Sequence, residues 1–239
     1  MKLSGKTAIV TGAGQGIGKA TALALAREGC NIVACARNEQ HLNALAREVE
    51  LYGARCAIVS ADLRDLSTVE KILAATEPFG SIDILINNAG VIHNDGIAGV
   101  TEAIWDETMD VNLKAPFFLA QAVFERMKPN AEGGYIIQIS STVALGAKPG
   151  VTSYSVSKYG VSGMAEALYQ EAKQYGVKVS TIYPGVTDTE MLRGQNMPCV
   201  PEQWMLPEDI ADCVLFLLKT SGRMIVKDLI PWSTEYDQI

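Results

Sequence analysis

A glycine-rich turn between a predicted strand and a predicted helix constrains the fold of this chain more than any other feature. Residues 6–11 are a short apolar run rich in β-branched side chains, which predicts a buried strand. The turn at 12–18 follows at once, and residues 19–28 have helical periodicity. This order places a helix N-terminus beside a glycine turn whose backbone can closely approach a phosphate, as a phosphate-binding site requires. The alternative, that the glycines form only a turn, remains open at this stage.

The glycine spacing departs from the common G-x-G-x-x-G pattern. Ile17 stands where the third glycine of that pattern would be. The turn matches T-G-x-x-x-G-x-G instead, through Thr11, Gly12, Gly16 and Gly18. We therefore expect a dinucleotide-binding turn of a variant kind.

Strand and helix patterns alternate along the rest of the chain, which predicts a mostly parallel, doubly wound sheet with helices on both faces. Further strands are expected at residues 31–36, 54–61, 82–86, 134–139, 177–183 and 223–231. Further helices are expected at residues 38–52, 67–76, 101–127, 152–175 and 207–219. Residues 193–206 are irregular and suggest a short lid, and 232–239 form a tail. With no repeat or linker, we expect one domain over 1–239, with its site beyond the carboxyl ends of the strands.

Composition excludes several classes of function. The net charge of -7 argues against a nucleic-acid surface and against docking on anionic lipid. No apolar run reaches the length of a membrane span, and no signal peptide is recognisable, so we expect a cytoplasmic protein. The five cysteines are scattered without a C-x-x-C pair, and His41 and His93 have no ligand-like neighbours, so neither disulfides nor a metal site is expected.

The end of the second predicted strand bears on the choice of cofactor. An acidic residue there would accept a hydrogen bond from an adenosine ribose and favour NAD(H). This strand ends instead in Ala36-Arg37-Asn38, and an arginine suits a phosphate. We therefore predict NADP(H) rather than NAD(H), with a solvated Arg37 as the alternative.

Polar residues follow two other predicted strands and interrupt one helix. Asp62 stands after the third strand, where it could accept from an adenine amine or cap the next turn. The run 87–90, Asn-Asn-Ala-Gly, follows the fourth strand and could be structural as well as contacting a cofactor. Asn112 lies between apolar neighbours within a helical pattern, which indicates a buried polar group that needs partners.

Tyr154 and Lys158 lie one helical turn apart on one face of a predicted helix. A neighbouring ammonium favours the phenolate, so we expect the pKa of Tyr154 to move toward neutrality. Tyr169 and Lys173 repeat the spacing, but lie roughly 22 Å further along the helix. Only Tyr154 is near the carboxyl edge of the sheet, so we expect Tyr169 to have a packing role.

Ser141 ends the fifth strand, thirteen residues before Tyr154. A hydroxyl there can donate to a carbonyl oxygen that gains negative charge. No nucleophile-elbow pattern and no histidine accompany it, so a hydrolase serine is improbable on this pattern.

Taken together, these motifs resemble the short-chain dehydrogenase/reductase family, and the resemblance covers nearly the whole chain. It is carried by Thr11-Gly12-x-x-x-Gly16-x-Gly18, Asp62, Asn87-Asn88-Ala89-Gly90, Asn112, Ser141, Tyr154-x-x-x-Lys158 and Pro184-Gly185. It implies a Rossmann-type sheet of about seven strands and a homodimer or homotetramer built on the two long helices. It also implies that Tyr154 donates and accepts the proton, that Lys158 binds the nicotinamide ribose and lowers the pKa of Tyr154, that Ser141 rather than Ser140 holds the substrate oxygen, and that Asn112 holds a water.

The same resemblance implies a set of cofactor contacts, which includes the catalytic pair. These residues are Gly12, Gly14, Gln15, Gly16, Ile17, Gly18, Arg37, Asp62, Leu63, Asn88, Ala89, Gly90, Tyr154, Lys158, Pro184, Gly185, Thr187 and Thr189. The substrate pocket is expected to include Val143, Leu145, Val186, Met191 and the lid.

Among subgroups, the chain is most similar to 3-oxoacyl-acyl-carrier-protein reductases. It departs from them at its end, where Lys227 to Thr234 replaces a paired-glycine turn. The leading prediction is hydride transfer from NADP(H) to a small-molecule or acyl-thioester carbonyl. Three alternatives stand beside it: a non-catalytic NADP(H)-binding redox sensor, an NAD-dependent small-alcohol dehydrogenase, and a sugar-nucleotide epimerase, for whose substrate domain the chain has no room.

Overall fold

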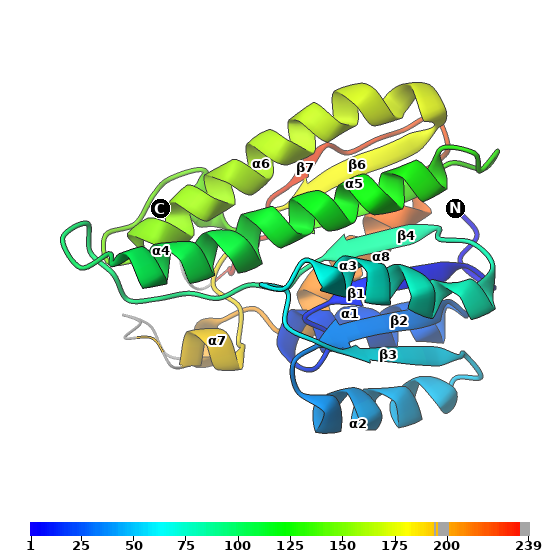
Figure 1. Ribbon diagram of the computed structural model, residues 1–239, viewed down its shortest axis with the longest axis horizontal. Helices are drawn as coiled ribbons and strands as arrows, with labels where there is room; N and C mark the ends of the chain where they lie inside the picture. The colour runs from blue at the N-terminus through cyan, green and yellow to red at the C-terminus, as the bar shows by residue number, and fades with distance from the viewer. Residues whose placement is uncertain (194, 196–200, 235–239) are drawn as a thin grey trace.

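The structure is a computed structural model and describes residues 1–193, 195 and 201–234. Within these residues, seven strands form one sheet in the order β3-β2-β1-β4-β5-β6-β7 (Figure 1). All of its strand pairs are parallel. The strands are β1 (Thr7–Thr11), β2 (Asn31–Ala36), β3 (Cys56–Ser60), β4 (Ile84–Asn87), β5 (Gly134–Ile139), β6 (Val177–Ile182) and β7 (Asp228–Leu229).

Helices cover both faces of the sheet, as Figure 1 shows. One face is covered by α1 (Gly16–Arg27), α2 (Glu39–Glu50) and α8 (Pro207–Lys219). The other is covered by α3 (Ser67–Thr76), α5 (Ala115–Met127) and α6 (Thr152–Ala172), with α4 (Glu102–Met109) packed against α6. The short helix α7 (Glu190–Arg193) lies near the carboxyl ends of the strands. The doubly wound, Rossmann-type fold predicted from the sequence is confirmed.

The strands are buried on both sides, and their side chains alternate between two cores. In β1, Ala8 and Val10 face the core under α1, α2 and α8. Ile9, between them, faces the core under α3, α5 and α6, and all three side chains are fully buried. Each strand therefore supplies apolar side chains to both helical layers.

The sheet has a topological switch point between β1 and β4. From β1 the chain builds outward through β2 and β3, then crosses back to place β4 on the other side of β1. The loops after β1 and β4 consequently leave in opposite directions and open a crevice at the carboxyl edge. This crevice is where the glycine turn and the loop after Asn87 meet.

The predicted helix at 101–127 is interrupted by a widened, π-helical turn at Asp110–Lys114. Pro116 follows at the start of α5 and has no N–H to donate to the carbonyl of Asn112, four residues earlier. The widened turn accommodates that missing bond, and π-turns of this kind often occur at functional sites. Asn112 lies inside it.

Several predicted boundaries differ from the structure by a few residues. The helix α1 begins at Gly16 rather than at Lys19, β3 is shorter than the predicted strand at 54–61, and the last turn of the predicted helix at 152–175 is a 3-10 turn at Lys173–Tyr175. Residues 194 and 196–200 of the lid predicted at 193–206, and residues 235–239 of the predicted tail, lie outside the described residues. The described part of the lid includes a 3-10 turn at Pro201–Gln203.

The strand predicted at 223–231 is much shorter, because only Asp228 and Leu229 form β7. Before them, the Lys178 ammonium donates to the carbonyls of Ser221 (2.7 Å) and Met224 (2.6 Å), which holds that stretch in a turn. After them, Pro231 has no N–H to contribute to a ladder. The chain still runs beside β6, since the carbonyl of Pro231 accepts from the amide of Gly185 at 3.1 Å.

The described cysteines, Cys30, Cys35, Cys56 and Cys213, are all free, and Cys199 lies outside the described residues. Burial raises the pKa of both Cys30 and Cys35 to about 12. Across the same described part of the chain, no helix is long and apolar enough to cross a membrane, and no cluster of side chains suits a metal ion.

Candidate active site

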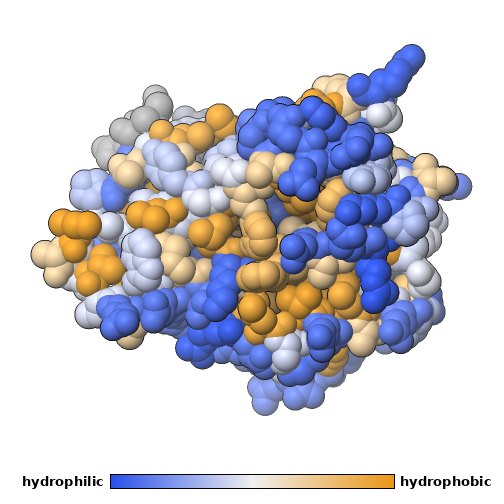
Figure 2. Space-filling model, turned by 45° about the horizontal axis from the view of Figure 1, so that its top comes forward, coloured by the Kyte–Doolittle hydropathy of each residue, from blue (hydrophilic) through white to orange (hydrophobic). Residues whose placement is uncertain are grey.

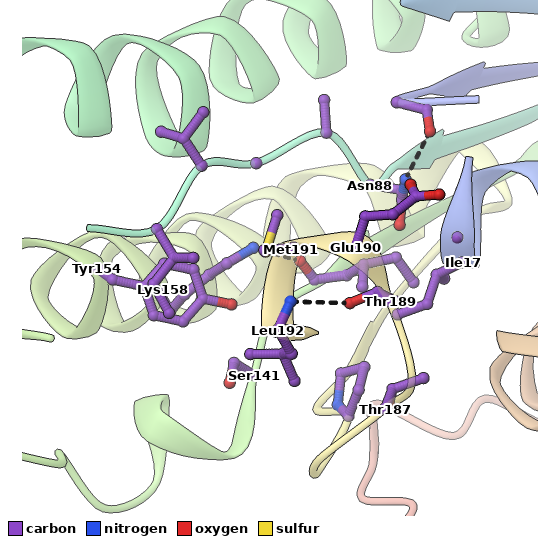
Figure 3. Close-up of a pocket in the computed structure, with 18 of the residues that line it drawn as sticks. Ile17, Asn88, Ser141, Tyr154, Lys158, Thr187, Thr189, Glu190, Met191 and Leu192 are labelled. Atoms are coloured by element: carbon purple, nitrogen blue, oxygen red, sulfur yellow. Dashed lines mark hydrogen bonds between the residues drawn. The ribbon is translucent and has the colours of Figure 1, made fainter. Parts of the chain in front are cut away.

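A pocket of about 760 Å³ opens along the carboxyl edge of the sheet, from the glycine turn to Tyr154. Figure 3 shows its lining, with Tyr154 and Lys158 at one end and Ile17 and Asn88 at the other. Nearly every predicted catalytic and cofactor-binding residue lines it. The exceptions in that set are Gly18, which packs against Gly12, and Asn112, which bonds to the lining residue Val91. The lining residues among those predicted are Gly12, Gly14, Gln15, Gly16, Ile17, Arg37, Asp62, Leu63, Asn88, Ala89, Gly90, Ser141, Tyr154, Lys158, Pro184, Gly185, Thr187 and Thr189.

The glycine turn is packed so closely that Gly12 and Gly18 have no room for a side chain. Gly12 and Gly16 both have positive φ, at 65° and 52°. A Cβ at Gly18 would lie 2.2 Å from the carbonyl oxygen of Gly12 and 2.5 Å from the Asn88 side-chain nitrogen. Gly18 thus lets α1 begin directly against the turn, which directs the N-terminus of that helix toward the pocket.

Asn88 fastens the loop after β4 to the end of β1. Its side-chain nitrogen donates to the carbonyl of Thr11 at 2.9 Å, while its own amide donates to the Thr11 hydroxyl at 3.0 Å. The amide of Ala89 donates to the same hydroxyl at 3.1 Å. The two sides of the switch point are therefore held together, so the structural role foreseen for this run is confirmed.

At the far end of the turn, Arg37 and Asp62 line the pocket from the ends of β2 and β3. Arg37 is exposed, and its guanidinium makes no hydrogen bond or ion pair with any described residue. The Asp62 carboxylate accepts from the amide of Arg64 at 2.9 Å and pairs with its guanidinium at 2.6 Å. Those bonds to Arg64 lower the pKa of Asp62, and they show the turn-capping role that was one of its two predicted roles.

Tyr154 and Lys158 both enter the pocket from the first turns of α6 (Figure 3). The Lys158 ammonium lies 5.6 Å from the centre of the Tyr154 ring and donates to the carbonyl of Ile139 at 2.8 Å. Lys158 is only 4% exposed, so this contact with the end of β5 holds a buried cation in place. The helical spacing therefore brings the pair together as predicted.

The protonation of the pair differs from the prediction. Burial raises the pKa of Tyr154 to about 12, and a hydrogen bond with Ser141 opposes that rise. Burial also lowers the pKa of Lys158 to about 8. The predicted shift of Tyr154 toward neutrality is therefore wrong for this structure, because removal of the phenol from water outweighs any stabilisation of the phenolate by the amine. Tyr154 is therefore a protonated phenol at neutral pH, and the Lys158 ammonium beside it loses its proton more readily than an exposed lysine does.

Asn112 is buried in the widened turn and has all the partners that its position demands. Its side-chain oxygen accepts from the amide of Val91 at 2.8 Å, and its nitrogen donates to the carbonyl of Val91 at 2.9 Å. The nitrogen also lies 3.0 Å from the Ser157 hydroxyl, on the helix that carries Tyr154. Asn112 thus links the loop after β4 to α6.

The two serines after β5 point in different directions. The Ser140 hydroxyl donates to the carbonyl of Lys158 at 3.2 Å, which ties β5 to α6. The Ser141 hydroxyl accepts from the amide of Val143 at 3.3 Å, and it is close enough to Tyr154 to lower the pKa of the phenol. Ser141 is therefore the serine whose hydroxyl is beside the phenol.

The loop after β6 forms another wall of the pocket. Its Pro184 carbonyl accepts from the amide of Thr142 at 3.1 Å, and the Thr187 hydroxyl donates to the carbonyl of Gly185 at 3.1 Å. Thr189 accepts from the amide of Leu192 at 3.4 Å, at the start of α7 (Figure 3). This wall meets the glycine turn, since a Cβ at Gly16 would lie 3.2 Å from a Thr189 methyl group.

The sequence located the pocket but missed part of its lining. Val143, Val186 and Met191 line it as predicted, whereas Leu145 does not and is 52% exposed. Leu145 follows a 3-10 turn that directs its side chain outward. Gln195 lines the pocket as part of the predicted lid. The missed residues belong to no motif, and many of them lie in loops that meet only in the folded chain: Ala36, Asn38, His41, Ala61, Val91, Ile92, Asn94, Val111, Ile139, Ser140, Thr142, Lys148, Pro149, Gly150, Val151, Glu190, Leu192 and Trp232.

Tyr169, the second tyrosine with a lysine four residues later, does not line the pocket. It packs at the margin of the core under α3, α5 and α6. The ammonium groups of Lys173 and Lys227 lie 5.8 Å and 5.0 Å from its ring centre. The packing role predicted for Tyr169 agrees with this position.

A doubly wound sheet with a glycine turn at its switch point and a tyrosine–lysine pair across the pocket is typical of oxidoreductases that use a nicotinamide cofactor. The family model described as short chain dehydrogenase matches residues 6–198. The chain therefore belongs to the short-chain dehydrogenase family, as the motifs suggested.

Two relatives show how broad this family is. The chain is 34% identical to the 2-dehydro-3-deoxy-D-gluconate 5-dehydrogenase of Escherichia coli (strain K12), over 93% of this chain and 92% of the relative. It is 30% identical to the 3-oxoacyl-acyl-carrier-protein reductase FabG of Thermotoga maritima, over 96% of this chain and 97% of the relative. The substrates in these two names differ, so the likeness establishes the family but not the substrate.

Two solved structures share the whole fold. A metagenomic short-chain oxidoreductase in complex with NADP has a TM-score of 0.83 and 31% identity, over 97% of this chain and 99% of that one. A short chain dehydrogenase from Mycobacterium paratuberculosis bound to NAD has a TM-score of 0.86 and 26% identity, over 96% of this chain and 97% of that one. Together they support a nicotinamide cofactor and leave the choice between the two forms open.

Proposed function

We propose that this chain is an NADP(H)-dependent oxidoreductase that reduces a carbonyl, or in reverse oxidises a secondary alcohol, with Tyr154 as its proton donor. The observation that carries the proposal is the buried Tyr154–Lys158 pair, with the Ser141 hydroxyl beside the phenol, in the pocket that begins at the glycine turn. Reduction of a carbonyl requires a proton for its oxygen, and this group of side chains is suited to deliver one.

The residues at the other end fit a nicotinamide dinucleotide. A side chain at Gly12 or Gly18 would collide with neighbouring atoms, and glycine at these positions leaves the backbone amides of the turn and the N-terminus of α1 open to a pyrophosphate. Asn88 to Gly90 and the wall from Pro184 to Thr189 would hold the nicotinamide half. When bound, such a cofactor supplies or accepts the hydride.

This chain's own residues then handle the proton. Tyr154, whose pKa is raised to about 12, remains protonated at neutral pH and can donate to a carbonyl oxygen. Ser141 can donate a second hydrogen bond to that oxygen as it gains negative charge. Lys158, whose pKa is about 8, can exchange a proton near neutral pH and lies beside the phenol. Asn112 fixes the loop that faces them and can order a water for this relay.

We propose NADP(H) over NAD(H) because of Arg37. The exposed guanidinium stands at the end of β2, beside the pocket, where a 2'-phosphate would lie. It makes no hydrogen bond or ion pair with a described residue, although its charge contributes to the lowered pKa of Asp62. An arginine fork binds phosphate well, and the nearest acidic residue in sequence, Glu39, belongs to α2.

For the substrate, we propose a small-molecule or acyl-thioester carbonyl of the kind that 3-oxoacyl-acyl-carrier-protein reductases use. The part of the pocket beyond Tyr154 mixes apolar side chains such as Val143 and Leu192 with polar ones such as Asn94. That mixture suits a chain that carries both hydrocarbon and oxygen groups. The sugar acid named for the Escherichia coli relative belongs in the same trial of substrates.

We also propose a homodimer or homotetramer built on the long helices. Hydrophobic patches interrupt the polar surface seen in Figure 2. On the helices themselves, the exposed apolar side chains are Trp105 of α4, Phe117 and Phe118 of α5, and Val156 and Tyr159 of α6. Burial of these groups against a second copy would remove them from water.

The test begins with absorbance at 340 nm, using NADPH and a panel of ketones, 3-oxoacyl thioesters and keto sugar acids. On the substrate that is turned over, Tyr154→Phe should lower kcat by about 1,000-fold or more, because the proton donor is gone, and should leave NADPH affinity within a few-fold. Tyr169→Phe is the matched control, since it removes the same hydroxyl from the same helix outside the pocket.

Full activity of Tyr154→Phe would reject the proposed role. No oxidation of NADPH by the wild-type protein across the whole panel, combined with tight NADPH binding, would favour the sensor. A strong preference for NADH would favour the NAD-dependent alternative.

A further inference from the structure

The helix α6 carries Tyr154 in its third position but does not cap its own N-terminus. Its N-cap residue is Val151, which has no polar side chain to accept a hydrogen bond, and its first turn contains no acidic residue. The first amides of a helix have no partners within the helix and must find them elsewhere. Because α6 carries Tyr154, partners for these first amides must come from another segment if the phenol is to be held in place.

Asp95, in the loop after β4, supplies the missing cap from another part of the chain. Its backbone carbonyl accepts from the amide of Thr152 at 3.1 Å, and its carboxylate accepts from the amide of Ser153 at 3.3 Å. The same carboxylate oxygen accepts from the Ser153 hydroxyl. Asp95 therefore binds both of the first two residues of α6, and Tyr154 is the next residue.

The contact is buried, which makes it costly to lose. Asp95 is 2% exposed and Ser153 is fully buried. The second carboxylate oxygen of Asp95 has no hydrogen-bond partner among the described residues. A buried carboxylate is stable only where donors face it, and here these are the amide and the hydroxyl of Ser153, at the positive end of α6.

The loop that carries Asp95 is also a wall of the pocket. Val91, Ile92 and Asn94 line it. Asn112 holds both the amide and the carbonyl of Val91, at 2.8 Å and 2.9 Å, so the segment 91–95 is fixed at one end by Asn112 and at the other by α6. Movement at Asp95 would therefore shift the phenol and this wall relative to each other.

We propose that Asp95 is a positioning residue, which caps α6 from the neighbouring loop and thereby sets the place of the Tyr154 hydroxyl against the substrate-facing wall. The inference rests on the proposed role of Tyr154. Asp95 does not take part in proton transfer, since its contacts are with Thr152 and Ser153 and it does not line the pocket. Loss of Asp95 should lower kcat, because a misplaced catalytic group stabilises the transition state less well, whereas it changes the binding of the cofactor little.

The experiment compares Asp95→Ala with Asp95→Asn. Alanine removes the cap, so kcat should fall about 10-fold to 100-fold while the dissociation constant of NADPH stays within about 3-fold. Asparagine caps helices as well as aspartate, so Asp95→Asn should recover kcat to within about 3-fold of the wild type. Hydrogen exchange should become faster in Asp95→Ala at the first turn of α6 and in 91–95, a readout that needs no substrate.

Asp65→Ala is the matched control. Asp65 accepts from the amide and the hydroxyl of Ser67, at 2.9 Å and 2.6 Å, at the start of α3, so it makes the same pair of bonds at a helix that carries no proposed catalytic residue. Its kcat should stay within about 2-fold of the wild type. If Asp95→Ala does not fold, Ser153→Ala, which removes only the hydroxyl donor, should lower kcat several-fold without raising the NADPH dissociation constant.

Several outcomes would overturn the inference. The first is a wild-type kcat in Asp95→Ala. The second is a loss of kcat in Asp95→Asn or in Asp65→Ala that equals the loss in Asp95→Ala. Where Asp95→Ala cannot be prepared, a wild-type kcat in Ser153→Ala would also overturn the inference. Failure of the proposed function is a separate result, since it would show as full activity of Tyr154→Phe whatever the Asp95 variants do.

Discussion

At the glycine turn the wall of the pocket is backbone, whereas around Tyr154 it is a set of side chains that arrive from four different segments. The turn is held by close packing, in which Gly18 meets the carbonyl of Gly12 and Asn88 bonds to the end of β1. The Tyr154 end is held by buried polar bonds from Lys158, Asn112 and Asp95. The first end should not tolerate an added atom at Gly12 or Gly18, and the second should be sensitive to charge and to hydrogen-bond geometry.

Gly18→Ala should have the largest effect on the glycine end. The added Cβ would overlap the carbonyl oxygen of Gly12 at 2.2 Å, so α1 must move away from the turn. We expect NADPH affinity to fall by about 100-fold, together with a loss of stability of about 1–3 kcal/mol. A fluorescence titration with NADPH and a urea unfolding curve measure the two.

Gly222→Ala is the control for that change, because a Cβ there meets no atom within 4 Å. It should leave both NADPH affinity and stability close to the wild type. NADPH binding by Gly18→Ala at wild-type strength would show that the turn is less tightly packed than the structure indicates.

Lys158→Met tests the polar end through the pH dependence of stability. Burial lowers the pKa of Lys158 from 10.5 to about 8, so the unfolded chain binds more protons than the folded chain between these values. The penalty for burying the ammonium is fully present below pH 8 and is lost as the pH rises toward 10.5. The free energy of unfolding of the wild type should therefore rise, relative to Lys158→Met, by on the order of 2 kcal/mol from about pH 8 to pH 10.

Urea unfolding of both proteins at several pH values measures this difference. Lys173→Met is the control, since Lys173 is an exposed lysine that follows the same helix and stands four residues after Tyr169. Parallel pH profiles for the wild type and Lys158→Met would mean that the ammonium is not desolvated as the structure shows.

Arg37→Leu should have the smallest of the three effects, because Arg37 is exposed and acts only by its charge. We expect KM for NADPH to rise about 10-fold and KM for NADH to stay within about 2-fold, since only the former carries the extra phosphate. Steady-state kinetics with each cofactor give the two KM values, and added salt should reduce the difference in KM for NADPH between the wild type and Arg37→Leu. Arg55→Leu, which removes a guanidinium that stacks 4.6 Å from the Phe79 ring, is the control away from the pocket.

The glycine end could be predicted almost residue by residue because its signals are local. A strand, a glycine turn and a helix are consecutive in the chain, so their order in sequence is also their order in space. The same holds for Tyr154 and Lys158, whose spacing alone puts them on one face of α6. Pro116, which shifts the hydrogen bonds around Asn112, was also visible, but its consequence was a widened turn and not the continuous helix that periodicity predicted.

The sequence by itself determined the parallel sheet, the turn at its switch point and the pairing of a phenol with an amine, because apolar alternation and residue spacing act over a few neighbouring positions. Only the tertiary structure decided that burial raises the pKa of Tyr154 to about 12 and that Asp95 caps its helix. These properties depend on burial and on contacts between segments up to 58 positions apart, as from Asp95 to Ser153. Desolvation and long-range hydrogen bonds have no local signature, since they arise only when the chain closes on itself.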